Sequence, residues 1–182
     1  MTFEKTVILK DGRNCLLRNG VTSDGKAVLD VFNRTHEETD YLLTYSDENC
    51  FTASQEADFL QRKTDSTNTV EIIAVVDGVV AGTAGIDALG MRDKIKHRAV
   101  FGIAITKEFW GLGIGKSLME ACIECAREAG YLQLELEVVA ENERAVEMYR
   151  RAGFIEYGRN PKAFRLRTGE YQELIDMRLE LK

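Results

Sequence analysis

The stretch Trp110-Gly111-Leu112-Gly113-Ile114-Gly115 follows the apolar run Val100 to Ile105 and opens an apolar-periodic segment, Lys116 to Glu128. This order predicts a strand, a glycine-rich turn and a helix. Glycines at such a junction let the backbone approach a ligand closely, and free amides at the positive end of the helix dipole favour an anionic group. The stretch therefore predicts a site for a phosphate-bearing cofactor; the alternative is an ordinary turn between a strand and a helix.

A second motif lies downstream, from Asn142 to Phe154, with the sequence Asn-Glu-Arg-Ala-Val-Glu-Met-Tyr-Arg-Arg-Ala-Gly-Phe. Together the two motifs resemble the later half of a Gcn5-related N-acetyltransferase, and the resemblance extends over residues 70–182. It implies a mixed α/β fold, the acyl-CoA N-acyltransferase fold, in which about four helices flank a largely antiparallel sheet of about seven strands. In that family the position of Trp110 is usually Arg or Gln, so one polar side chain expected near the cofactor is missing.

The composition is that of a globular protein. The chain has 182 residues, 45% of them apolar and 30% charged, so we expect a single domain spanning residues 1–182. No apolar stretch has the length of a membrane span, which predicts a cytoplasmic protein that binds no membrane. The net charge of -6 argues against nucleic-acid binding and favours a cationic or amine substrate; the alternative is a merely solvated acidic surface.

The four cysteines predict core packing rather than metal or redox chemistry. Cys122 and Cys125 are three residues apart in a predicted helix and therefore share its apolar face. The same interpretation covers Cys15 and Cys50. With only two histidines elsewhere in the chain, we expect no metal site.

Local signals divide the first half of the chain into strands and helices. Asp11-Gly12 and Asp77-Gly78 each predict a two-residue hairpin turn between apolar runs. A helix capped by Thr22-Ser23-Asp24 and another beginning at Thr52 or Ser54 are predicted from side chains that can cap and from apolar residues at helical spacing. The segment Glu37 to Cys50 between them is polar and irregular.

The second half continues with strands and one further helix. Gln133 to Val139 alternates between apolar and polar residues, which predicts a strand with one core face and one polar face. A helix from Asn142 to Ala152 should end at Gly153, a left-handed cap position. Two final strands, Phe154 to Arg167 and Tyr171 to Leu181, should flank Thr168-Gly169.

The family resemblance implies acetyl-CoA as the cosubstrate and indicates where it lies. The thioester and the pantetheine arm would follow Ile103-Ala104-Ile105, where two neighbouring strands splay apart, and the amide near Ile105 would polarise the acetyl oxygen. The pyrophosphate would lie over Gly111, Leu112, Gly113, Ile114, Gly115 and Lys116. The alternative for residues 103–105 is an ordinary buried strand.

Asn142 and Tyr149 are seven residues apart, so they share one helix face about 10 Å apart along the axis. By resemblance, Asn142 contacts the cofactor arm and Tyr149 protonates the leaving sulfur. The alternatives are a helix N-cap for Asn142 and, for Tyr149, a core aromatic whose hydroxyl is satisfied locally.

Glu137 is the preferred candidate for the general base. The strand Val100 to Ile105 carries no carboxylate, whereas Leu136-Glu137-Val138, with Glu137 twelve residues before Tyr149, resembles the ribosomal-protein N-terminal acetyltransferases, in which the corresponding Glu is assigned that role. The alternative is a solvated sheet edge, with Glu135 on the same face. Glu108 is expected to be exposed in a loop.

These residues predict an acetyl-CoA-dependent N-acetyltransferase that acts by direct attack of an amine on the thioester, without a metal. The preferred acceptor is a small-molecule amine, and a protein N-terminus is the alternative. A non-catalytic acyl-CoA-binding module is the alternative from another class. A homodimer is compatible with the sequence.

Overall fold

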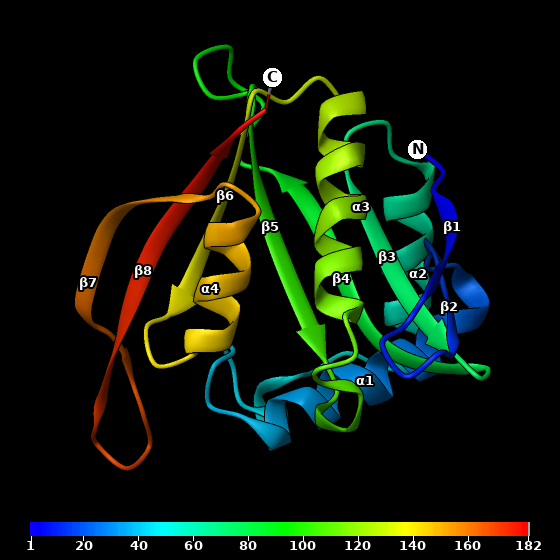
Figure 1. The fold of residues 1–182 in the computed structure, drawn as a ribbon, viewed down its shortest axis with the longest axis horizontal. Helices are drawn as coiled ribbons and strands as arrows, with labels where there is room; N and C mark the ends of the chain where they lie inside the picture. The colour runs from blue at the N-terminus through cyan, green and yellow to red at the C-terminus, as the bar shows by residue number, and fades with distance from the viewer. Residues whose placement is uncertain (182) are drawn as a thin grey trace.

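The computed structural model describes residues 1–181. Eight strands form one sheet and four α-helices cover it (Figure 1). The strands are β1 (Glu4–Ile8), β2 (Asn14–Asn19), β3 (Val70–Val76), β4 (Val79–Ala88), β5 (Arg98–Ile105), β6 (Gln133–Val139), β7 (Ile155–Arg165) and β8 (Tyr171–Glu180). The helices are α1 (Gly25–Glu38), α2 (Ala53–Asp65), α3 (Ile114–Glu128) and α4 (Glu143–Arg151).

The strands lie in the order β1-β2-β3-β4-β5-β6-β8-β7. Every neighbouring pair is antiparallel except β5 and β6, which are parallel and are joined by α3. The mixed α/β fold with a largely antiparallel sheet is therefore confirmed. The sheet has one strand more than the expected about seven.

The two predicted hairpin turns differ in outcome. Asp77-Gly78 is a two-residue turn with φ of 52° and 80°, as such a turn between twisted strands requires. The first hairpin is wider than predicted, because β1 ends at Ile8 and β2 begins at Asn14. There Asp11 accepts a hydrogen bond from the Arg13 amide at 3.1 Å and pairs with the Arg13 side chain, which stabilises the longer loop.

The helix starts follow local capping chemistry. Thr52 caps α2: its hydroxyl accepts from the Gln55 amide at 3.3 Å, and the Gln55 side chain accepts from the Thr52 amide at 2.8 Å. Before α1, Asp24 ends a 3-10 turn and its carboxylate binds Arg18 at 2.6 Å instead of capping the helix. The predicted α2 start at Thr52 is confirmed, and α1 is preceded by a turn that the spacing alone did not indicate.

The helices cover both faces of the sheet (Figure 1). On one face α3 and α4 close the main core, where Leu118 packs in the same cluster as Leu136 of β6. On the opposite face α1 and α2 contribute Val28 and Leu60, which pack around Ile73 of β3. Successive side chains along a strand therefore point alternately toward the face covered by α3 and α4 and toward the face covered by α1 and α2.

Three of the four cysteines are buried, and one is not. Cys122 and Cys125 of α3 and Cys15 of β2 lie in the main core, and burial raises the pKa of each thiol. The expectation for Cys50 was wrong: it is exposed in the loop before α2, because the polar segment there has no apolar face to bury it. The core interpretation of Cys122 and Cys125 is confirmed.

Within residues 1–181, no helix is long and apolar enough to cross a membrane. The same residues contain no group of three or more His, Cys, Asp or Glu side chains placed to hold a metal ion.

Candidate active site

The parallel strands β5 and β6 part in the middle of the sheet. They pair only over three residues, Arg98 to Val100 with Gln133 to Glu135, and then diverge toward the end of the molecule that carries the glycine loop (Figure 1). Residues 101–105 of β5 therefore have a strand partner only on the β4 side. This is the splay expected at Ile103-Ala104-Ile105, and it leaves backbone groups facing the gap available to a ligand.

The glycine loop leaves the start of α3 uncapped. Gly111 and Gly113 have φ of 81° and 100°, and a Cβ on either would meet no atom within 4 Å. No side chain caps the helix, and its first backbone bond runs from the Ser117 amide to the Gly113 carbonyl at 3.2 Å. The amides of residues 114–116 precede that bond, so they point out of the helix end and favour an anion.

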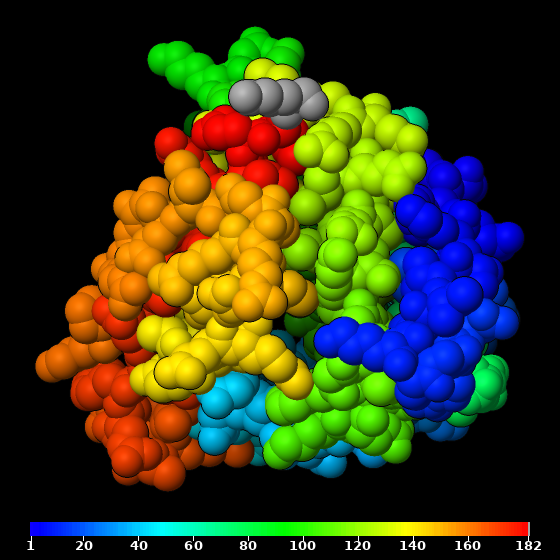
Figure 2. Space-filling view, viewed as in Figure 1, coloured from blue at the N-terminus to red at the C-terminus, as the bar shows by residue number. Residues whose placement is uncertain are grey.

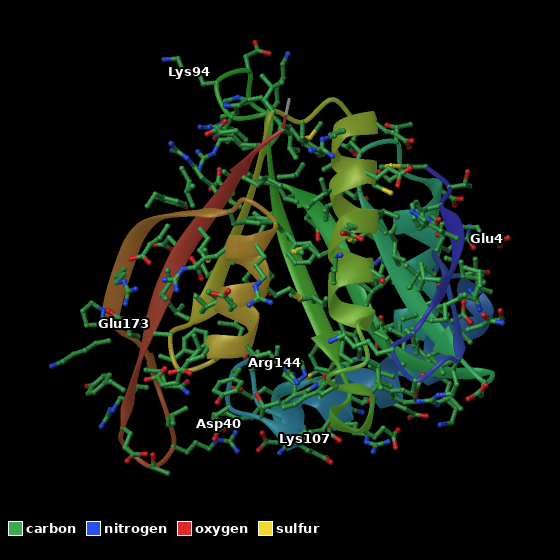
Figure 3. All side chains as sticks on the ribbon, viewed as in Figure 1. Glu4, Asp40, Lys94, Lys107, Arg144 and Glu173 are labelled. Atoms are coloured by element: carbon green, nitrogen blue, oxygen red, sulfur yellow. The ribbon has the colours of Figure 1, made fainter. Side chains whose placement is uncertain are left out.

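Trp110 and Arg144 form a contact that the sequence did not reveal. The indole Nε1 of Trp110 donates to the Ile105 carbonyl at 2.7 Å, and the Arg144 guanidinium stacks 4.0 Å from the centre of the Trp110 ring. Arg144 lies in the first turn of α4, at the glycine-loop end of the molecule (Figure 3). A cationic side chain thus stands beside the loop although Trp110 replaces the family's Arg or Gln. Burial lowers the Arg144 pKa, but a guanidinium stays charged.

Asn142 is the N-cap of α4, as one of its two interpretations predicts. Its side-chain oxygen accepts from the Ala145 amide at 3.4 Å. That bond fixes the carboxamide at the entrance of the helix, on the same side of the sheet as α3. A role in cofactor contact stays a prediction.

Tyr149 lies in the core between α4 and β5. Its ring makes an edge contact with Phe101 at 6.1 Å and a tilted contact with Phe154 at 5.8 Å between centroids. Only 6% of the residue is exposed, and burial raises the pKa of its hydroxyl, which therefore stays protonated at neutral pH. Within the described chain the hydroxyl has no hydrogen-bond partner, in contrast to Tyr131, whose hydroxyl donates to the Asn68 carbonyl at 2.9 Å.

The space-filling view shows this face of the molecule hollowed between α3 and α4 (Figure 2). The parted strands lie beneath this furrow in Figure 1. The uncapped end of α3 and the N-cap of α4 both lie toward its glycine-loop end. A long, thin ligand with an anionic group at one end fits this arrangement.

The two glutamates of β6 face away from α4 but differ in their surroundings. Glu135 is 8% exposed; Arg98 binds both of its carboxylate oxygens, and the Tyr157 hydroxyl lies 3.4 Å from one of them. The hydrogen bond from Arg98 lowers the Glu135 pKa. Glu137 is exposed, stands opposite Asp176 of β8, and has no ion pair or hydrogen bond among residues 1–181. The alternative of a solvated edge therefore does not hold for Glu135, whereas Glu137 is exposed where β5 and β6 part, and its role as the base stays a prediction.

We expect Glu135→Gln to lower stability at pH 7 by about 2 kcal/mol, because it leaves the partly buried Arg98 charge unpaired. The corresponding fall in melting temperature is about 5 °C. Arg98 lowers the Glu135 pKa in the folded state, so the ion pair stabilises the fold above the usual pKa of Glu and loses this effect as pH falls below it. Thermal unfolding of the wild type and of Glu135→Gln, at pH 7 and in acid, measures this effect. The difference between their melting temperatures should be smaller in acid, and an equal difference at both pH values would contradict the prediction.

A model of the acetyltransferase (GNAT) family matches residues 28–154. The L-amino acid N-acetyltransferase AaaT of Escherichia coli (strain K12) is 32% identical over 118 residues, which are 64% of this chain and 72% of that protein.

Solved structures show the same architecture. An acetyltransferase of the GNAT family from Streptococcus pneumoniae superposes with a TM-score of 0.87 at 28% identity, over 91% of this chain and 99% of that chain. The structure of yncA from Salmonella typhimurium with its cofactor acetyl-CoA superposes with a TM-score of 0.82 at 17% identity, over 93% of this chain and 95% of that one. With parted central strands that end beside an uncapped, glycine-led helix, the chain belongs to the acetyltransferase (GNAT) family and is an acetyl-CoA-dependent N-acetyltransferase.

Proposed function

We propose that the protein transfers the acetyl group of acetyl-CoA directly to the primary amine of a small molecule. The observation that carries this proposal is the gap between β5 and β6, which opens next to the uncapped start of α3. The L-amino acid N-acetyltransferase of Escherichia coli, by its name, acts on amino groups of small molecules. Its similarity to this chain favours a small acceptor over a protein N-terminus.

In this proposal the pyrophosphate of acetyl-CoA lies over residues 111–116. The helix end supplies free amides, and Arg144 adds a positive charge from the facing helix. The pantetheine arm follows Ile103, Ala104 and Ile105 along the open edge of β5, and Asn142 borders the arm from α4. Trp110 fixes the end of β5 through the Ile105 carbonyl, so the strand edge stays in place for the thioester.

The chemistry needs a proton acceptor for the ammonium and a proton donor for the thiolate. Glu137 and Tyr149 lie on opposite faces of the sheet at the gap, so the amine and the thioester reach it from opposite sides. Glu137 takes a proton from the ammonium, the neutral nitrogen attacks the carbonyl carbon, and the amide near Ile105 stabilises the oxyanion. As the carbon–sulfur bond breaks, the thiolate takes the Tyr149 proton, and the second proton that the nitrogen loses on forming the amide passes through water to restore Tyr149.

We expect Gly113→Val to raise the acetyl-CoA dissociation constant at least about tenfold, which corresponds to about 1.4 kcal/mol. At a φ of 100°, a branched side chain strains the loop and turns its amides away from the phosphates. Gly130→Val is the matched control: Gly130 has a φ of 80° and equally open surroundings but lies at the far end of α3. Calorimetry with acetyl-CoA on both folded variants checks the prediction. An equal loss of affinity in the two variants, or no loss in Gly113→Val, would contradict it.

Release of free thiol from acetyl-CoA tests the acceptor class. A panel of amino acids, polyamines and aminoglycosides is compared with peptides that carry free N-termini. We expect turnover with small amines to exceed turnover with the peptides. Faster turnover with the peptides would favour the N-terminal alternative, and an absence of turnover with all of them would favour the non-catalytic module.

We also propose that residues 1–182 act as one N-acetyltransferase domain. The β1–β2 hairpin precedes the residues that the family model matches, yet it adds two strands to the same sheet. Its turn also contacts the cofactor loop, because the Lys10 amide donates to the Leu112 carbonyl at 3.1 Å.

A further inference from the structure

Two glycines lie side by side on the face of the sheet that α1 and α2 cover in part. Gly85 of β4 pairs with Gly102 of β5, and their neighbours Ile86 and Phe101 point into the core beneath α3. The glycines therefore present bare backbone to the opposite face. A Cβ on Gly102 would meet no atom within 4 Å, so the space above this residue is open.

Glu71 of β3 reaches into this region. It pairs with Gly85, and a Cβ built on Gly85 would lie 2.1 Å from Oε2 of Glu71. The carboxylate thus occupies the place of the missing Gly85 side chain and leans from β3 across β4 toward Gly102. Glu71 and Gly102 are two strands apart, about 10 Å between Cα atoms, and the side chain covers about half of that distance.

The groups around Glu71 do not neutralise it by an ion pair. Lys63 of α2 is the nearby cation, but its ammonium binds Asp87 at 2.5 Å and the Ile86 carbonyl at 3.2 Å. Burial raises the Glu71 pKa to about 7; the Lys63 charge and a hydrogen bond with Thr83 oppose this rise, and the charges of Asp87 and Glu56 reinforce it. A partly buried carboxylate with a raised pKa and no ion pair weakens the fold, which suggests a role with a ligand.

A second carboxylate on α2 supports a cationic ligand. Glu56 is only 8% exposed, and within residues 1–181 its side chain has no hydrogen bond or ion pair. It lies in the first turn of α2, which packs against β3, and its charge acts on Glu71. Two partly desolvated carboxylates that form no ion pair favour a positively charged occupant.

Glu137 closes the other side of the same space. Val100 pairs with Glu135, so Gly102 and Glu137 are the next residues on this face of β5 and β6, where the strands part. The open space above Gly102 therefore has Glu71 on its β3 side and Glu137 on its β6 side.

We propose that the acceptor binds as an ammonium ion in the space above Gly102, between Glu71 and Glu137, and that Glu71 is the residue that selects a cationic amine. This deepens the proposed function and rests on it. Glu71 holds the ammonium, Glu137 takes its proton, and the neutral nitrogen then attacks the thioester across the gap. The acceptor class is an aliphatic amine that is protonated at neutral pH, in preference to an arylamine, which is not.

Steady-state kinetics of Glu71→Gln with an aliphatic amine and an arylamine test this. We expect the KM of the aliphatic amine to rise about tenfold or more, from the loss of a charge-assisted contact, with kcat changed far less. The KM of the arylamine should not change. In the wild type the KM of the aliphatic amine should rise as pH falls below about 7, where Glu71 takes a proton, and this rise should be absent in the variant.

Two further variants separate the site from general charge and folding effects. Glu4→Gln removes one charge from the exposed edge strand β1, which lies four strands from β5 at the sheet edge away from the gap (Figure 3), and should leave both constants unchanged. Gly102→Ala adds a methyl group to open space, so it should fold normally and raise the amine KM while leaving acetyl-CoA affinity unchanged.

A wild-type protein that acetylates no amine would contradict the proposed function itself. An active wild type whose amine KM is unchanged in both Glu71→Gln and Gly102→Ala would overturn only this inference. If Glu71→Gln failed to fold, the result with Gly102→Ala would decide.

Discussion

Replacing Tyr149 with Phe should lower kcat about a hundredfold, the usual effect of losing one general acid, and leave acetyl-CoA affinity unchanged. The hydroxyl acts only as the carbon–sulfur bond breaks, so it stabilises the transition state and not the bound cosubstrate. Its pKa is raised by burial, which keeps the proton available at neutral pH. Steady-state turnover with a reactive amine and calorimetry with acetyl-CoA measure the two quantities.

Tyr131→Phe is the matched control. Tyr131 is as buried as Tyr149, with 4% against 6% exposed, but its hydroxyl is used in a hydrogen bond to Asn68. This variant should lose about 1 kcal/mol of stability and no turnover. Normal turnover of Tyr149→Phe would make Tyr149 a core aromatic only and would assign the acid role to water.

Replacing Glu137 with Gln should lower kcat by about a hundredfold or more, because the amine must lose a proton before it attacks. The variant keeps the shape of the side chain and removes its ability to accept a proton. If Glu137 is the base, the variant should be much less active at every pH at which the wild type is active, and its residual rate should no longer fall toward acidic pH. If it only attracts the cation, KM should rise, the salt dependence of KM should weaken, and kcat should persist.

Asp176→Asn separates these roles, because Asp176 lies directly opposite Glu137 on β8 and contributes a similar charge to the same face. A base at Glu137 predicts a much smaller loss of kcat in Asp176→Asn than in Glu137→Gln. A Glu137→Gln profile that overlays the wild type, with neither constant changed, would return Glu137 to the solvated-edge interpretation.

Those parts of the fold that depend on neighbouring residues could be predicted from the sequence. The two-residue turn at Asp77-Gly78, the N-cap at Thr52 and the α4 cap at Asn142 each arise from chemistry within a few residues. The glycine loop and the start of α3 follow in the same way. The family resemblance then indicated where the central strands part.

Features that depend on sheet register could not be predicted in this way. Alternation along β6 predicted a polar face that includes Glu135, but it could not show that Arg98 and Tyr157 reach this carboxylate from strands that are distant in sequence. The stacking of Arg144 on Trp110 joins two motifs that no local pattern connects.

The position of Glu71 is a further example. The open space that Glu71 borders can be recognised only from the pairing of β3, β4 and β5, which places Gly85 and Gly102 beside it. In the sequence it is a single polar residue inside an apolar run, with no signal of the space it borders.

The central claim is that acetyl transfer is direct, between acetyl-CoA and an amine held together at the gap between β5 and β6. Rapid-quench mass spectrometry with acetyl-labelled acetyl-CoA, in the presence and absence of an accepted aliphatic amine, tests it most directly. The label should appear on the amine only when both substrates are present, and the protein should carry no label at any time. Label on the protein, or thiol release at the same rate without an amine, would contradict the account.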